Sequence, residues 1–505
     1  MAGSIMIQGT MSNAGKSILV GGLCRVLVQD GYKAAPFKSQ NMALNSFITK
    51  DGLEMGRAQV MQAEAAGIEP AAEMNPILLK PTNDTGSQVI VNGEPVGVMS
   101  AAEYYRKKKE YIPAILKAYH RLREVYDVIV IEGAGSPAEI NLKENDLVNM
   151  GFAKMVDAPV LLVGDIDRGG VFAQIVGTIE LLEEEERRRI RGTVINKFRG
   201  DKEILKPGLR MLENKTGIPV LGVVPYVDLD IDDEDSLTER FSKKDKSGRI
   251  DIAVIRLPRI SNFTDFAPLE GLEDVSLRYV SRVSEFGDPD AVMLPGTKNT
   301  IGDLKWLRQS GLEARILSHS ARGRLLFGIC GGYQMLGERI EDPEGLEWKG
   351  SIKGLGLLPM TTTFVPKKTC TRVKGRFQNV RGLLHELNHM EAEGYEIHMG
   401  VSKTTGEQIL GLTDDTAGGT KKEDGLCTDH VYGCYVHGIF DRAEITEVIV
   451  RALLGQKGYT DESVKAFDMA EYKEEQYDKL AGIVRESIDM EAVRRMIEEK
   501  GDTEE

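Results

Sequence analysis

The sequence lacks the features of a membrane-embedded or secreted protein. Its 505 residues contain no apolar run as long as the roughly 18–20 residues that span a bilayer. The N-terminal stretch has no basic segment followed by an apolar one, so we expect no secretory signal peptide. There are only five cysteines, at positions 24, 330, 370, 427 and 434, and no two have C-x-x-C spacing. We therefore expect no disulfide framework, no membrane partner and a cytoplasmic location, where thiols stay reduced.

An excess of positive charge is also absent. The formal net charge is −14 at pH 7, which argues against nucleic acid as a main partner. Hydrophobic residues make up 41% of the chain, an ordinary share for a soluble globular protein. A length of 505 residues exceeds what one hydrophobic core usually serves, so we expect two or three domains. The oligomeric state stays open, a homo-oligomer included.

Strand-like and helix-like segments alternate in the first part of the chain. Short Val/Ile-rich runs at 5–9, 128–133, 159–165 and 192–197 are typical of strands buried on both faces of a parallel sheet. Longer amphipathic segments lie between them, and this alternation predicts an α/β domain with a parallel sheet covered by helices. A second series of strand-like runs follows a stretch dominated by charge. We predict a first domain over 1–230, a charged linker over 231–249, a second α/β domain over 250–450 and a C-terminal helical extension over 451–505.

The first site that the sequence indicates is a phosphate-binding loop. The segment GTMSNAGKS, residues 9–17, follows a strand-like run and opens a helix-like one. Backbone N–H groups in such a loop, with the helix N-terminus, cradle phosphate oxygens, and Lys16 would reach the terminal phosphates of ATP. The loop has one residue more between its glycines than the usual G-x-x-x-x-G-K-[ST] motif. Asn196 ends another strand-like run, where its amide could read the adenine edge, with a plain strand-end turn as the alternative. The residues expected to bind ATP are Thr10, Asn13, Ala14, Gly15, Lys16, Ser17 and Asn196.

A magnesium ion would need oxygen ligands beside this loop. The Ser17 hydroxyl is one expected ligand. Glu132 ends a strand-like run before a glycine loop, where α/β sheets bind their ligands, and is the second expected ligand. A capping or solvated glutamate is the alternative. Asp165 and Asp167 end another strand-like run and are secondary candidates.

The second site centres on a cysteine between glycines. The segment G-I-C-G-G puts Cys330 at a turn from strand to helix, the geometry of a nucleophile elbow. Small neighbours let the backbone turn sharply and expose the sulfur, and the helix N-terminus favours the nucleophilic thiolate. The backbone N–H groups of Gly331 and Gly296 are expected to stabilise an oxyanion.

A cysteine nucleophile needs a base, and His437 is the expected one. It follows a short β-like run and precedes Gly438, which would keep it accessible. A structural histidine is the alternative reading. His398 is the second choice, as a base or as a substrate contact.

Each half of the chain resembles a known family. The phosphate loop and the E-G-A-G segment at 132–135 resemble the dethiobiotin synthetase-like branch of P-loop proteins, which implies that ATP phosphorylates a carboxylate and a nitrogen attacks the acyl phosphate. The segments around Cys330 and His437 resemble class I glutamine amidotransferases, which implies a glutamyl thioester and release of ammonia. Many members carry a glutamate two residues after the histidine, where this chain has Ile439. The third member of the triad is therefore missing or comes from elsewhere, with Glu396 and Asp441 as candidates.

The resemblance extends along the whole chain. Four segments are similar to those of the cobyric acid synthases, in the corrinoid amidotransferase family: PFKSQNMALNS (36–46), GDIDRGGVFA (164–173), NKFRGD (196–201) and GICGGYQMLG (328–337). The resemblance implies a ligase that uses ATP, Mg²⁺ and L-glutamine to amidate the b, d, e and g carboxylates of adenosylcobyrinic acid a,c-diamide, giving adenosylcobyric acid in cobalamin biosynthesis. Lys38, Gln40 and Asn41 are expected to contact the corrinoid diamide or the phosphates, with a plain polar loop as the alternative.

Two other functions stay open at this point. One is the sister enzyme that amidates the a and c carboxylates of cobyrinic acid. The other is a P-loop switch ATPase of the partitioning type that carries a degenerate amidotransferase-like domain as a binding module.

Overall fold

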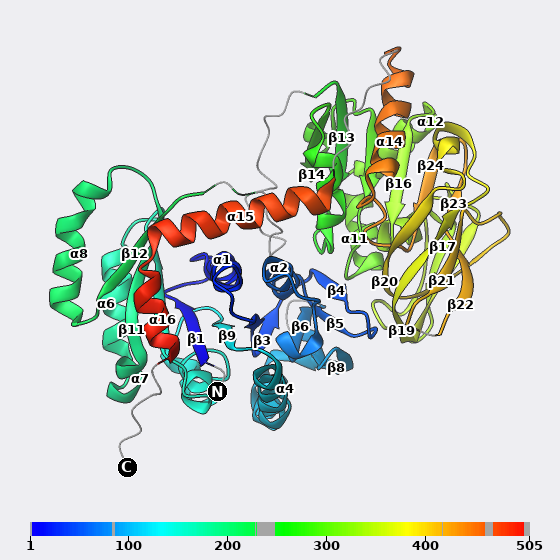
Figure 1. Ribbon diagram of the computed structural model, residues 1–505. Helices are drawn as coiled ribbons and strands as arrows, with labels where there is room; N and C mark the ends of the chain where they lie inside the picture. Colours follow the sequence, from blue (N-terminus) through cyan, green and yellow to red (C-terminus); the bar gives the residue numbers. More distant parts are fainter. Residues whose placement is uncertain are drawn as a thin grey trace. The chain divides into compact units, whose positions relative to one another are not determined.

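The computed structural model describes residues 3–82, 86–227, 229, 248–416, 418–459 and 468–498. The chain forms two compact units, one of Met1–Ala43, Met55–Glu234 and Lys473–Glu505 and the other of Leu44–Glu54 and Asp235–Tyr472 (Figure 1). This division is not the linear one expected from the sequence, because each unit also contains a segment from the far side of the boundary. Nearly all of the expected linker 231–249 lies outside the described residues.

The first unit is built on a six-stranded parallel sheet in the order β12-β11-β10-β1-β9-β2. Its central strands β1, β9 and β10 are mostly apolar and are buried except at Gly3, as expected for strands covered by helices on both faces. The strands are β1 (Gly3–Gly9), β2 (Ala34–Phe37), β9 (Val128–Glu132), β10 (Val160–Asp165), β11 (Ile190–Phe198) and β12 (Val220–Pro225).

Helices and a smaller sheet complete this unit. The helices are α1 (Lys16–Gln29), α2 (Arg57–Ala65), α3 (Ala101–Lys107), α4 (Ile112–Val125), α5 (Met150–Met155), α6 (Val171–Leu181), α7 (Glu184–Arg189) and α8 (Lys202–Thr216). The smaller sheet has the order β3-β6-β7-β8, with β3 (Gln40–Met42), β6 (Ile77–Pro81), β7 (Gly86–Val91) and β8 (Glu94–Ser100). A two-stranded ladder joins β4 (Ser46–Ile48), which belongs to the second unit, to β5 (Glu54–Gly56), where the chain returns to the first unit.

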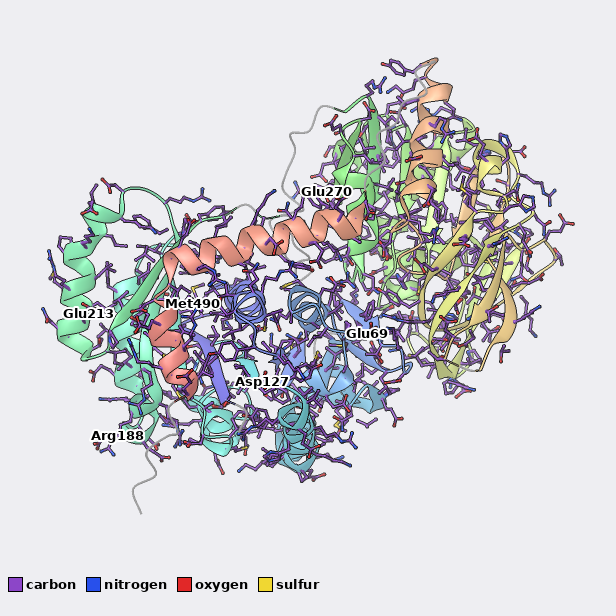
Figure 2. The ribbon with its side chains drawn as sticks, viewed as in Figure 1. Glu69, Asp127, Arg188, Glu213, Glu270 and Met490 are labelled. Carbon is purple, nitrogen blue, oxygen red and sulfur yellow. The ribbon has the colours of Figure 1, made fainter. Side chains whose placement is uncertain are left out.

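The end of the chain belongs to the first unit because its apolar side chains complete that core. The last helices are α15 (Met469–Ser487) and α16 (Met490–Glu498), and α16 lies against β1 (Figure 1). Val484 approaches α1 so closely that a Cβ at Gly22 would lie 2.7 Å from it. Met490, labelled in Figure 2, is buried in the same core.

The second unit contains another mostly parallel sheet, in the order β14-β13-β15-β16-β24-β23. Its strands are β13 (Ile250–Ile255), β14 (Val275–Val280), β15 (Ala291–Leu294), β16 (Leu325–Ile329), β23 (Leu426–Cys427) and β24 (Val431–Cys434), of which only β23 is antiparallel to its neighbour. The helices are α9 (Ala267–Gly271), α10 (Val283–Phe286), α11 (Thr300–Gln309), α12 (Leu312–Ala321), α13 (Gly331–Leu336) and α14 (Ala443–Gln456).

A second sheet in this unit is built around two long antiparallel strands, β19 (Met360–Phe377) and β20 (Glu391–Thr404). Its other strands are β17 (Arg339–Asp342), β18 (Gly350–Lys353), β21 (Leu410–Asp414) and β22 (Thr420–Asp424). The α/β class expected from the sequence, with one mostly parallel sheet in each half, is confirmed. Among the described helices, none combines the length and the apolar composition needed to cross a membrane.

Candidate functional site

The loop between β1 and α1 has the backbone shape of an anion cradle. Asn13 and Gly15 adopt left-handed conformations, with φ of 60° and 90°, and Gly15 directly precedes α1. A Cβ at Gly15 would lie 2.1 Å from Nδ2 of Asn196, so only glycine fits there. The Lys16 ammonium donates hydrogen bonds to the carbonyl oxygens of Met11, at 3.0 Å, and Gly135, at 3.2 Å. It is therefore held at the loop, as a phosphate-binding lysine requires.

Side chains from the end of β11 and from α6 form hydrogen bonds with the loop. Asn196 donates from Nδ2 to the carbonyl oxygen of Ala14 at 2.8 Å, and Lys197 donates to that of Asn13 at 2.7 Å. Thr10 donates from Oγ1 to Gln174 Oε1 at 3.1 Å. The Asn196 amide thus supports the shape of the loop, and the expectation that it reads adenine stays a prediction.

Glu132 lies at the centre of a buried polar cluster at the end of β9. Its side chain is fully buried and accepts hydrogen bonds from Ser17 Oγ at 2.9 Å and from Lys38 Nζ at 2.8 Å. Gln62 and Gln59, on α2, donate to the other oxygen at 2.6 and 3.3 Å. These partners offset the cost of burying a carboxylate. The two expected Mg²⁺ ligands, Ser17 and Glu132, are therefore brought together.

The residues expected to contact the substrate divide between two places. Lys38 pairs with Glu132, and Asn41 donates to Gln59 Oε1 at 3.1 Å, so both belong to the buried cluster. Gln40 instead accepts a hydrogen bond from the Tyr104 hydroxyl at 2.7 Å. Of the secondary metal candidates, Asp165 is paired to Lys197, which also donates to the Asn13 carbonyl oxygen of the loop, and Asp167 is paired to Arg199.

In the second unit, Cys330 lies at a strained turn between β16 and α13. Its φ of 50° and ψ of −106° are unusual for a residue with a side chain, as in a nucleophile elbow. The neighbouring glycines are required by close backbone approach: a Cβ at Gly332 would lie 2.1 Å from the Leu294 carbonyl oxygen, and one at Gly328 would lie 2.8 Å from the Tyr333 nitrogen. Cys330 is 7% exposed, and its thiol lies 3.7 Å from the Ile397 carbonyl oxygen.

His437 forms a buried pair with Asp265. Its Nδ1 donates to Asp265 Oδ2 at 2.7 Å, and the Gly438 N–H donates to Oδ1 at 2.9 Å. Burial alone would lower the pKa of His437, but the Asp265 carboxylate, followed by contact with Cys330, outweighs burial and raises that pKa to about 10. The imidazole therefore carries a proton at neutral pH, beside the sulfur. The expected nucleophile and base are in contact.

Both glycines expected to form the oxyanion hole lie beside this pair. A Cβ on Gly296 would be 2.9 Å from Cε1 of His437. A Cβ on Gly331 would be 2.7 Å from Thr297 Cγ2. A side chain at either position would therefore crowd these neighbours.

The structure corrects the expectation for the third triad member. Asp265, on the 3₁₀ turn Phe263–Phe266, orients His437, whereas Glu396 pairs with Lys422 and His398. Asp441 was the other candidate, and the carboxylate at the imidazole is not Asp441 but Asp265. No local motif marks Asp265, because it lies 172 residues from His437 in the sequence.

A polar cluster that the sequence did not indicate, formed by Thr300, Gln334 and Tyr435, lies near the cysteine. Gln334 accepts a hydrogen bond from Thr300 at 3.0 Å and donates to the Tyr435 hydroxyl at 3.3 Å. His398 stacks on Tyr435 with ring centroids 3.8 Å apart and bonds through Nδ1 to the Gly400 carbonyl oxygen. His398 therefore has structural partners of its own, and it is His437 that contacts the cysteine.

Two family descriptions match consecutive parts of the chain. Residues 5–237 match the CobQ/CobB/MinD/ParA nucleotide binding domain, and residues 251–445 match the CobB/CobQ-like glutamine amidotransferase domain. Three similar relatives each bear the name cobyric acid synthase. The chain is 58% identical over 503 residues to that of Ruminiclostridium cellulolyticum, with 99% of this chain and 98% of the relative covered. It is 58% identical over 514 residues to that of Lachnoclostridium phytofermentans (99% and 100% covered) and 51% identical over 501 residues to that of Clostridium kluyveri (98% of each).

Proposed function

This chain belongs to the cobyric acid synthase family, and from that membership we propose that it converts adenosylcobyrinic acid a,c-diamide to adenosylcobyric acid by amidating the b, d, e and g carboxylates. The chain is a glutamine-dependent amide ligase with a nucleotide-binding domain. The observation that carries the proposal is the Cys330–His437–Asp265 arrangement on the unit that matches the amidotransferase family.

The glutaminase half of the reaction uses that arrangement. The Cys330 thiolate attacks the side-chain carbonyl carbon of glutamine, and the backbone N–H groups of Gly331 and Gly296 stabilise the oxyanion that forms. His437 gives its proton to the departing nitrogen, so ammonia leaves and a glutamyl thioester remains. Water then attacks the thioester, with His437 accepting its proton, and glutamate is released.

The synthetase half uses the phosphate loop. A corrinoid carboxylate oxygen attacks the γ-phosphorus of ATP, ADP leaves, and an acyl phosphate forms. Lys16 and the loop N–H groups stabilise charge on the transferring group. Ammonia then attacks the acyl carbon, and phosphate departs as the amide forms. Ammonia is mostly protonated at neutral pH, so its production by the same chain favours capture before it is lost to solvent.

Magnesium fits the oxygen ligands at the phosphate loop. Ser17 Oγ and Glu132 Oε1 lie 2.9 Å apart, and Lys38 brings a positive charge to the same carboxylate, as a cation would. Among the residues that the structure describes, no group of three or more His, Cys, Asp or Glu side chains could enclose a metal ion. This suits Mg²⁺, which usually takes one or two protein ligands and completes its shell with water and substrate phosphates. When bound, it would supply positive charge to the phosphate oxygens.

The test is a count of amides. Purified protein is supplied with the diamide corrinoid, Mg-ATP and glutamine, and the product is examined by mass spectrometry. We expect four added amides, each with one ATP and one glutamine consumed. A competition between the diamide and cobyrinic acid separates the proposed function from that of the sister a,c-diamide synthase, and the diamide should win. ATP hydrolysis without any amide gain would contradict the proposal and favour a switch ATPase.

A further inference from the structure

Residues 44–54 belong to the second unit although the chain on both sides of them belongs to the first. Upstream, Lys38 and Asn41 take part in the Glu132 cluster. Downstream, α2 begins at Arg57 and carries two glutamines of the same cluster. The chain therefore leaves the region of the phosphate site, contributes one short segment to the amidotransferase unit and returns.

The segment holds Asn262 in place. Asn45 Oδ1 accepts a hydrogen bond from the Asn262 backbone N–H at 2.8 Å, and the Ser46 carbonyl oxygen accepts one from Asn262 Nδ2 at 3.1 Å. The same Nδ2 donates to the Tyr395 hydroxyl at 2.7 Å. All four residues are buried, Asn45 and Ser46 to 1% exposure. Asn262 has φ of 53°, a left-handed conformation that asparagine adopts more readily than most residues and that these partners hold in place.

Asn262 and Tyr395 connect the segment to the glutaminase triad. Asn262 begins the 3₁₀ turn that carries Asp265, and its carbonyl oxygen accepts a hydrogen bond from the Asp265 N–H at 3.0 Å. The Tyr395 ring stacks on His437 with centroids 5.3 Å apart, and the two backbones exchange hydrogen bonds at 3.1 and 2.8 Å.

The next two residues of the segment, Phe47 and Ile48, are also anchored. Phe47 contacts the Tyr395 ring, with centroids 5.3 Å apart. Arg372 lies over the Phe47 ring and donates to the Ile48 carbonyl oxygen at 3.0 Å. The segment is thus held by Arg372 on β19, by Tyr395 on β20 and by Asn262.

We propose that Asn45 and Ser46 are positioning residues of the glutaminase site, acting through Asn262 on Asp265 and through Tyr395 on His437. The proposal rests on the proposed glutaminase function. One continuous stretch, 38–48, then serves both chemistries: its first part contacts the Glu132 cluster and its last part sets the geometry of the His437–Asp265 pair. An amidotransferase unit cut from this chain at residue 250 would lack part of its own active site.

The test is the rate of glutamate release from glutamine by the full-length Asn45→Ala variant. Removing the Oδ1 acceptor leaves the buried Asn262 N–H unpaired and frees the turn that carries Asp265, so we expect kcat for glutamine hydrolysis to fall about 10-fold or more. The KM for glutamine should change less than about 2-fold, because no group that touches glutamine is removed. Ammonia-driven amidation should stay at the wild-type rate. Asn45→Asp, which keeps an acceptor oxygen at this position, should restore most of the loss.

Two further variants keep the test decisive. Tyr395→Phe removes the hydroxyl that Asn262 contacts and keeps the ring on His437, so it should lower kcat in the same way. It provides the test if Asn45→Ala does not fold. Asn388→Ala is the matched control: Asn388 also accepts from a backbone N–H, that of Val380 at 2.9 Å, but it has no contact with the triad, and kcat should not change.

The proposal is overturned if both Asn45→Ala and Tyr395→Phe hydrolyse glutamine within about 2-fold of the wild-type kcat. It is also overturned if Asn388→Ala loses as much as they do, since the effect would then be general destabilisation. Glutamate release is measured without a corrinoid, so failure of the corrinoid reaction in the wild type would refute the proposed function and leave this test standing.

Discussion

Asp265→Asn is the substitution that most sharply probes the glutaminase geometry. It removes one charge from a buried site and preserves the size of the side chain. The carboxylate accepts from His437 Nδ1 at 2.7 Å and from the Gly438 N–H at 2.9 Å, so both of its oxygens are used. The amide nitrogen of the variant must face one of these two donors, which breaks a hydrogen bond and disfavours the protonated imidazole.

Two limits bracket the size of the effect. A hydrogen bond to a charged group contributes about 1.5–3 kcal/mol, and loss of that amount slows the reaction at least about 10-fold. The carboxylate and Cys330 together raise the pKa of His437 to about 10, and its ordinary value is 6.5. That difference corresponds to about 5 kcal/mol in favour of the imidazolium, or a few thousand-fold if the rate lost all of it. We expect a fall in kcat of about 10²–10³-fold.

The assay compares two nitrogen sources. Glutamine hydrolysis should collapse in Asp265→Asn, while ammonia-driven amidation should be within about 2-fold of wild type. Asp441→Asn makes the same chemical change four residues from His437 and serves as the matched control, for which both rates should persist. Wild-type glutaminase activity in Asp265→Asn, or an equal loss in Asp441→Asn, would refute the assignment of Asp265.

Three further predictions address the rest of the account. Cys330→Ser should abolish glutamine hydrolysis yet leave amidation by added ammonia, and failure of ammonia to rescue a folded variant would contradict separate sites for the two half-reactions. Lys16→Ala should lower amidation from both nitrogen sources by about 10²-fold or more, because phosphate charge is no longer stabilised; unchanged turnover would move the ATP site elsewhere. His319 is buried with Nε2 bonded to the Leu325 carbonyl oxygen at 2.9 Å, and burial lowers its pKa to about 4 from 6.5. The unfolded chain takes up this proton below pH 6.5 and the folded chain only near pH 4, so stability is lost as pH falls through that window, by about 2 kcal/mol at pH 5. Urea titrations at pH 7.5 and 5 should show a correspondingly smaller loss in His319→Gln, and an identical loss would contradict this account of His319.

The parts of the sites that could be predicted are those held in one short stretch of sequence. The loop at 9–17 and the turn at Cys330 each depend on glycines at fixed offsets, because their backbones must adopt left-handed angles or approach a neighbouring strand closely. Such requirements leave a local pattern. The place of Glu132 beside the loop is indicated in the same way, by its position at the end of an apolar run before a glycine loop, and its role as a metal ligand stays a prediction.

The parts that were missed come from distant stretches joined only by folding. Asp265 reaches His437 across 172 residues, and Asn45 reaches Asn262 across 217. Asp265 belongs to no run with a recognisable period or motif, and Asn45, although it lies in the segment 36–46, has no local signal for its contact with Asn262. The same reason applies to the segment 44–54 and the C-terminal helix α16, because the unit to which each belongs depends on which core its side chains fill.

The central claim is that this chain activates a corrinoid carboxylate with ATP and captures on it the nitrogen taken from glutamine. It is tested most directly by isotope transfer in one reaction, with ¹⁸O in the corrinoid carboxylates and ¹⁵N in the glutamine side-chain amide. The account predicts one ¹⁸O in the released phosphate and one ¹⁵N in the product for every amide formed. Phosphate that carries no ¹⁸O while amides accumulate would contradict it.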